Sequence, residues 1–221
     1  MNKEIAEIIK RYAIEKHTEL NAYLLGKSKD TLVATLLDLL TIYINDKNSS
    51  TLREFLTVSL AGYEHGQKKI GYNGFRQSSI DVGKVDKCEA KPKNIDTEKK
   101  SKLNGNGNFT DYTFKRLAKD RSEKGLNMVV SGFVEGRLIY VLEFPFAYKK
   151  FVNNLKLQLG RHFPDHKDIK GSYLRSANFS YKDFVECEKL RVVFILKKDE
   201  LEKQRKYIVK GFFDFLLKKA E

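Results

Sequence analysis

The spacing of apolar side chains predicts a helical N-terminal part, residues 1–66. Apolar residues recur at intervals of three and four, the period of one face of an α-helix, at Ile5, Ile8, Ile9, Tyr12 and Ala13. A second stripe spans residues 32–44, and a third follows the capping box Thr51-Leu52-Arg53-Glu54. We expect these stripes to be buried as core, with dimer contact as a further role.

Longer apolar runs predict strands later in the chain. Residues 128–134 and 137–144 are almost continuously apolar, and Glu135-Gly136 between them is a strong hairpin signal. Such runs indicate two central, buried strands. Residues 190–196 predict another strand. Glu143 is expected at the surface of a strand end, with a buried acid near a metal ion as the alternative.

Helical spacing predicts the elements around this sheet. A short basic helix is expected at residues 112–120, another helix at 147–159, and a long terminal helix after Asp199. The expected fold class is therefore α/β, a mixed central sheet flanked by helices, with the N-terminal helical part attached. We predict one domain, residues 1–221, since no internal repeat or second core is visible.

Residues 80–94 carry the candidate chemistry. We expect a strand, a turn at Gly83-Lys84 and a second strand that Pro92 breaks. Glu89 and Lys91 stand two apart, so on a strand they point to the same face. Carboxylates can hold a hard divalent cation that promotes phosphodiester cleavage, and a neighbouring lysine can orient water or stabilise the phosphate.

Asp81 followed by Glu89-Ala90-Lys91 resembles the active-site signature of the PD-(D/E)XK nucleases. This superfamily includes many type II restriction endonucleases and the mismatch-repair nicking endonuclease. The resemblance implies a restriction-endonuclease-like core in which Asp81 and Glu89 bind Mg²⁺ and Lys91 assists the attacking water. It also implies a supplementary carboxylate, Glu64, which we place at the end of a helix. The resemblance covers residues 64–94.

The turn at Gly83-Lys84 leaves two candidates for the second metal ligand. A strict two-residue turn would pair Asp81 with Asp86 and would turn Asp81 away from Glu89. Either the connection is wider or bulged, or Asp86 replaces Asp81. The superfamily spacing favours Asp81, and Asp86 remains its rival.

The charge of the chain indicates a polyanionic partner. The net charge is +13 and the pI is about 9.5, which suits binding to nucleic acid. Basic, amide and hydroxyl side chains in three loops and in residues 160–189, the candidate DNA-reading segment, are predicted to contact double-stranded DNA: Lys68, Asn73, Arg76, Gln77, Lys93, Asn94, Asn106, Asn108, Arg175, Ser176, Asn178 and Lys182. We expect the Asn-Gly-Asn-Gly region within residues 94–108 to be a mobile loop.

The remaining features limit the class of protein. No apolar run is long enough to cross a bilayer, the N-terminus has no apolar signal core, and two cysteines form no disulfide framework. We therefore expect a cytoplasmic protein that does not associate with membranes. The predicted function is a Mg²⁺-dependent, site-specific endonuclease for double-stranded DNA that acts as a homodimer. A repair nickase, a junction resolvase and a non-catalytic nucleic-acid-binding protein are the alternatives.

Overall fold

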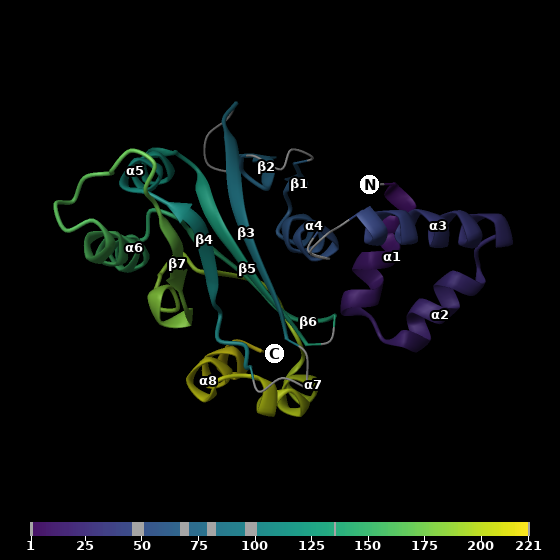
Figure 1. The fold of residues 1–221 in the computed structure, drawn as a ribbon. Coiled ribbons are helices and arrows are strands. Elements are labelled where there is room, and N and C mark those ends of the chain that lie inside the picture. The colour runs from purple at the N-terminus through teal and green to yellow at the C-terminus, as the bar shows by residue number, and fades with distance from the viewer. Residues whose placement is uncertain are drawn as a thin grey trace.

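A computed structural model describes residues 2–45, 51–66, 71–78, 83–95, 101–134 and 136–220. Helices come first, and strands interspersed with helices follow from residue 64 onward (Figure 1). In chain order the elements are α1 (Lys3–Ile14), α2 (His17–Leu25), α3 (Lys29–Asn45), α4 (Thr51–Leu60), β1 (Glu64–His65), β2 (Gly74–Gln77), β3 (Val85–Ile95), β4 (Gly107–Tyr112), α5 (Phe114–Ser122), β5 (Leu126–Val134), β6 (Arg137–Pro145), α6 (Lys149–His162), β7 (Leu174–Phe179), η1 (Tyr181–Asp183), β8 (Arg191–Ile195), α7 (Lys198–Lys203), η2 (Arg205–Tyr207) and α8 (Lys210–Lys219).

The central sheet has six described strands in the order β1-β2-β3-β5-β6-β8. The β3–β5 pair is parallel, and every other pair in this sheet is antiparallel. The two remaining strands, β4 and β7, form a separate antiparallel sheet. The predicted α/β class, with a mixed sheet flanked by helices, is confirmed.

Each face of the central sheet has its own hydrophobic core. On one face, α1 and α4 pack against β3, β5 and β6 through a cluster that includes Val58, Cys88 and Val129. On the other face, a larger aromatic cluster joins β5 and β6 to α6, α8 and the small sheet. Figure 1 shows α4 and the N-terminal helices on one side of the sheet, with α5, α6, β4 and β7 on the other.

Strand β3 places different chemistry on these two faces. Cys88 and Ala90 are buried toward α4, whereas Lys87, Glu89 and Lys91 face the side of α5 and β4 because side chains alternate along a strand. Contrary to our expectation, the strand continues through Pro92 to Ile95. The described part of β2 pairs with β3 only as far as Cys88. Proline is therefore accommodated where this side of β3 carries no described strand.

Two expectations about the N-terminal part are wrong. Glu64 lies in the short edge strand β1, opposite Phe75 of β2, and not at the end of a helix. The apolar stripe of α3 is not ordinary core, because Val33 is 49% exposed and Leu36 is 57% exposed. No described helix is long and apolar enough to span a membrane.

The Asn-Gly-Asn-Gly region is more ordered than we expected. Leu103 forms a bridge with Ile208, and β4 begins at Gly107. At Gly107 a Cβ atom would lie 2.5 Å from the Phe179 ring and 2.9 Å from Cβ of Lys91. Glycine therefore allows β4 to approach β3 closely beside Lys91.

Candidate active site

A pocket of about 450 Å³ opens over the polar face of β3. Glu89, only 9% exposed, and Lys91 stand on its wall, and Lys91 Nζ donates a hydrogen bond of 2.8 Å to Glu89 Oε1. Lys91 Nζ also lies 4.8 Å from the centroid of the Phe109 ring, a cation–π contact. The Glu-x-Lys pair predicted from strand periodicity is thus one ion pair inside a pocket.

Helix α5 adds a second carboxylate and two cations to the same pocket. Asp120 is 7% exposed and lines the pocket with Arg116 and Lys119. The Arg116 guanidinium lies between the two acids, 4.0 Å from Glu89 Oε1 and 3.8 Å from Asp120 Oδ2. Arg116 Nη1 also donates to the backbone oxygen of Thr110, at 3.0 Å, and this bond ties the guanidinium to β4.

Two tyrosines hold the Asp120 carboxylate in place. Tyr72 and Tyr112 each donate a hydroxyl hydrogen bond of 3.4 Å to it. Burial raises the pKa of Asp120 above its usual value, and the nearby charge of Glu89 adds to this rise, whereas Arg116 and the tyrosine hydroxyls oppose it. Burial likewise raises the pKa of Tyr72 and Tyr112, so both are hydroxyl donors at neutral pH. The pocket therefore contains two acids that repel each other unless a cation compensates them.

The connection before β3 bears on Asp86, one of the two rival ligands. Strand β2 pairs with β3 through Gln77 opposite Val85 and Arg76 opposite Asp86, so the connection is wider than a two-residue turn. Asp86 is buried on the α4 face, 3.6 Å from the Arg76 guanidinium, and points away from Glu89. Asp86 therefore cannot share a metal ion with Glu89. Asp81 lies outside the described residues.

The α4 face holds a separate charge cluster that serves the fold. Glu143, which we expected at the surface, is 4% exposed and accepts hydrogen bonds from Arg76, Arg191 and Tyr63. It stands opposite Val129, whose neighbour on β3 is Ala90. The cluster is thus on the face opposite Glu89, and the predicted DNA contact Arg76 is committed to it.

The other residues predicted on or near the first hairpin are dispersed. Asn73 lines the pocket, but its Oδ1 accepts the Ala90 N–H at 2.7 Å and so extends the pairing of β3. Glu64 is exposed and does not line the pocket. Gln77 is exposed at the end of β2, and Lys93 is exposed on the Glu89 side of β3. Asn94 Oδ1 accepts the Gly136 N–H at 3.0 Å. Lys68 lies outside the described residues.

The small sheet brings together residues predicted in two distant segments. Asn108 of β4 stands directly opposite Asn178 of β7, and Ser176 hydrogen-bonds to both side chains. Arg175 on the same strand and Lys182 in η1 are exposed nearby. Asn106 is not part of this group, because its Oδ1 is buried before β4 and has no hydrogen-bond partner among the described residues.

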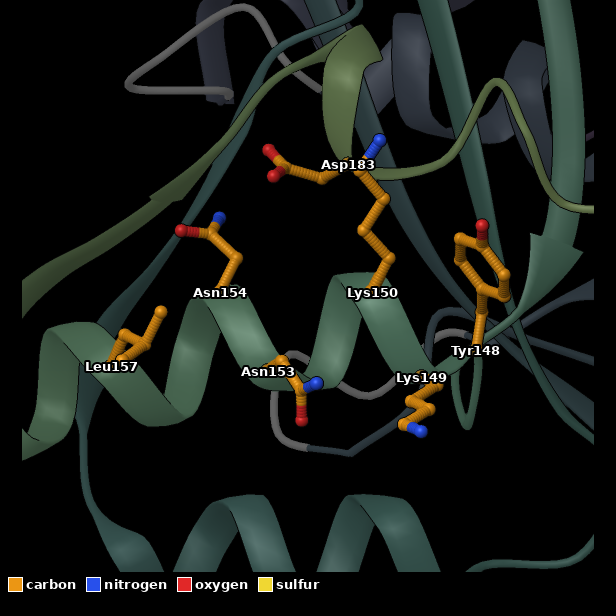
Figure 2. A pocket seen from close by; sticks show the side chains of 7 residues that line it. All are labelled: Tyr148, Lys149, Lys150, Asn153, Asn154, Leu157 and Asp183. Atoms are coloured by element: carbon orange, nitrogen blue, oxygen red, sulfur yellow. The ribbon is translucent and has the colours of Figure 1, made fainter.

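A second hollow, of about 570 Å³, lies between α6 and η1. Figure 2 shows Lys150 and Asn154 projecting from α6 toward the side of Asp183. The Lys150 ammonium is already paired with Glu186 at 2.8 Å, and Asn154 Nδ2 donates to the Asn178 backbone oxygen at 3.0 Å. This hollow has no concentration of reactive groups, and Asn154 on its lining supports β7.

The sequence analysis overlooked Arg116, Asp120, Tyr72 and Tyr112 as site residues. The signal was present, since Tyr112, Arg116 and Asp120 follow one another at intervals of four. That spacing places them on one side of a helix and its entry, but only the structure shows that this side faces Glu89. The chain matches no protein-family model, and a search of curated proteins finds no significant match.

Proposed function

We propose that the chain is a Mg²⁺-dependent endonuclease that hydrolyses phosphodiester bonds of double-stranded DNA at a short site, like the type II restriction enzymes of the PD-(D/E)XK superfamily. The observation that carries this proposal is the 2.8 Å Glu89–Lys91 pair in a pocket that also holds Asp120 and Arg116. Acids and cations in one pocket suit a reaction in which an anionic substrate meets a divalent ion.

The donor set of the pocket suits Mg²⁺. This ion usually takes one or two protein carboxylates and completes its shell with water and phosphate oxygens. Glu89 and Asp120 would supply two carboxylates, and the described residues contain no cluster of three or more metal-binding side chains. Asp81 would be a further ligand, as the superfamily resemblance implies. The bound ion would supply an activated water and neutralise phosphate charge.

The cationic side chains of the pocket have separable roles in this proposal. Lys91 has three N–H donors and uses one on Glu89, so the others can orient a water or a phosphoryl oxygen. Arg116 and Lys119 would hold the phosphate flanking the cut bond, because Arg and Lys are the usual partners of the DNA backbone. Phosphate binding would also relieve the repulsion among these cations.

The active form is proposed to be a homodimer. A palindromic duplex is met most simply by two-fold protein symmetry, with one pocket for each strand. The exposed apolar side chains of α3, including Val33 and Leu36, support this proposal because a protein surface rarely leaves such a stripe uncovered.

Cleavage of plasmid and long genomic DNA, with Mg²⁺ or with a chelator, tests the proposed activity. We expect discrete fragments only with the metal. Glu89→Gln and Lys91→Ala should lower the rate at least about 100-fold, the typical effect of losing one transition-state contact, and leave duplex affinity within about tenfold because the basic surface dominates binding. Lys218→Ala removes the same charge from α8, outside the pocket, and should cut at the wild-type rate.

Each alternative predicts a different product. A nickase gives only open circles from supercoiled plasmid, and a junction resolvase cuts branched but not linear duplexes. A non-catalytic binding protein retards DNA and leaves it intact under every condition. Wild-type cutting rates in Glu89→Gln and Lys91→Ala would remove the catalytic assignment of this pocket.

A further inference from the structure

The outward face of the small sheet carries four polar side chains without charge. Asn108 and Thr110 belong to β4, Ser176 and Asn178 belong to β7, and the register pairs Asn108 with Asn178 and Thr110 with Ser176. Phe109, Ala177 and Phe179, which alternate with them, are buried in the aromatic core, so these four face outward. At the Thr110–Ser176 end the next two residues, Asp111 and Arg175, are exposed. We call this set the ribbon face.

Hydrogen bonds fix the side chains of the ribbon face. Asn108 Nδ2 donates to Ser176 Oγ at 3.3 Å, and Ser176 Oγ donates to Asn178 Oδ1 at 3.2 Å. The Gln158 amide of α6 holds the backbone of Asn178 from both sides, donating to its oxygen at 2.6 Å and accepting its N–H at 2.8 Å. Prearranged side chains on a rigid element lose little conformational entropy when they bind a partner.

The chemistry of the ribbon face suits base edges better than phosphates. An asparagine amide can pair with N6 and N7 of adenine, and serine or threonine hydroxyls can bond to any base. None of the four residues is charged. The exposed cations Arg175 and Lys182 lie on the flanks, where contacts to the DNA backbone would position the face.

The dimensions of the ribbon also match duplex DNA. The major groove of B-DNA admits a two-stranded β-ribbon. Alternate residues on one face of a strand lie about 6.8 Å apart, close to two base-pair steps of about 3.4 Å. Thr110 belongs both to the ribbon face and to the lining of the Glu89 pocket, so the two regions are continuous.

We propose that the ribbon face reads base edges in the major groove of duplex DNA, over about two to three base pairs per protomer. The proposal rests on the proposed function for its substrate class, and it identifies the part of the chain that determines sequence preference. The cleavage pocket would act on the backbone beside the bases that the ribbon reads.

Selection from a duplex library with randomised positions tests this proposal. The full chain would carry Lys91→Ala, so that it binds without cutting, and would be compared with the same chain carrying Asn108→Ala or Asn178→Ala. We expect each loss to lower discrimination about tenfold at one or two of the selected positions. Asn178→Asp should shift preference from adenine toward cytosine, because a carboxylate accepts from cytosine N4. The matched control is Asn153→Ala, whose side chain points to the opposite side of α6 from Asn154 (Figure 2).

The outcomes separate this inference from the proposed function. If the ribbon variants select the same sequence as the parent with undiminished preference, or if an RNA duplex of that sequence binds as tightly, the inference is overturned. Plasmid cleavage by the wild-type chain is scored independently. If the wild-type chain cuts plasmid and the ribbon variants select the same sequence as the parent, the protein is a nuclease that does not read bases with the ribbon face. If the wild-type chain does not cut and the ribbon variants select a different sequence, the protein reads DNA sequence but is not a nuclease.

Discussion

Asp120 is the residue at which the proposed chemistry and the stability of the fold conflict. Its carboxylate is buried, close to Glu89, and its pKa is raised by burial and by the Glu89 charge. A carboxyl group whose pKa is higher in the folded than in the unfolded chain favours folding when protonated and opposes it when ionised. Ionisation of Asp120 therefore costs the folded chain stability relative to its protonated form.

Asp120→Asn is expected to stabilise the protein at pH 7 by roughly 1 kcal/mol and to abolish cleavage. The amide removes the buried charge but can still accept the hydroxyl hydrogen bonds of Tyr72 and Tyr112. The advantage should be largest at neutral pH and should shrink as the pH falls through the raised pKa toward about 4, the unfolded value. Urea unfolding at several pH values between 4 and 8 measures it.

Asp214→Asn is the matched control for Asp120→Asn. Asp214 is an exposed carboxylate of α8, paired with Lys210 four residues earlier as Asp120 is with Arg116. Its replacement should change the free energy of unfolding by less than about 0.5 kcal/mol. A less stable Asp120→Asn protein at pH 7, or an advantage that grows on acidification, would show that the Arg116 ion pair outweighs burial.

Single residues of the site were predictable where one strand decides their neighbours. Glu89 and Lys91 share a face because side chains alternate along β3. Arg116 and Asp120 reach the same pocket only through the packing of α5, about thirty residues later in the chain. Residue spacing within one helix does not reveal how that helix packs over a sheet. Which of Asp81 and Asp86 faces Glu89 likewise depends on the length of the connection between β2 and β3, and the composition of that connection does not predict its length.

The hydrogen bonds from helix α6 to strand β7 can be tested directly. Gln158 bonds to the N–H and the carbonyl of Asn178, as a neighbouring strand would. In Gln158→Ala the Asn178 amide loses its acceptor, so its hydrogen exchange should become at least about tenfold faster. The cost in global stability should be at most about 1 kcal/mol, because water can replace the lost bonds at this exposed edge.

Gln158→Glu is the matched variant for this support. It keeps a side-chain oxygen for the Asn178 N–H and replaces the donor to the Asn178 carbonyl with a carboxylate oxygen, which that carbonyl repels. Protection of the Asn178 amide should therefore be retained in Gln158→Glu and lost in Gln158→Ala, as measured by amide exchange in NMR spectra. Equal exchange rates in the wild type and in Gln158→Ala would mean that Gln158 does not hold this strand in solution.

Elements were predictable where local signals were strong. The β5–β6 hairpin follows from two apolar runs around Glu135-Gly136, and its two strands are central in the sheet as expected. Strand β4 was missed because the glycines and asparagines at its start and just before it are typical of loops. It is a strand because β7, more than sixty residues later, pairs with it and because Phe109 is buried. Pairing over such separations overrides local propensity.

For the molecule as a whole, the sequence predicted the fold class but not the order in which the strands are connected. The apolar content, with helical stripes and continuous apolar runs along the same chain, indicated the α/β class, which the structure confirms. The strand order, with β4 and β7 removed to a second sheet, followed from no local pattern. The excess of 13 positive charges predicts a polyanionic partner for the molecule as a whole, but it does not identify which face binds that partner.

The assembly state is the last prediction, and it depends on α3. Since Leu36 is 57% exposed on a stripe that we expected to be core, a two-fold contact between α3 helices would cover it. Light scattering of the wild type with a target duplex should give twice the chain mass of 25.6 kDa plus that of the DNA.

Leu36→Glu should give one chain per duplex and should leave plasmid mostly nicked, because each DNA strand then needs its own binding event. Leu157→Glu, at a 63% exposed position of α6, is the matched control and should remain dimeric. A wild-type complex with one chain per duplex would reject the dimer, and an unaffected Leu36→Glu protein would place the dimer contact on another surface.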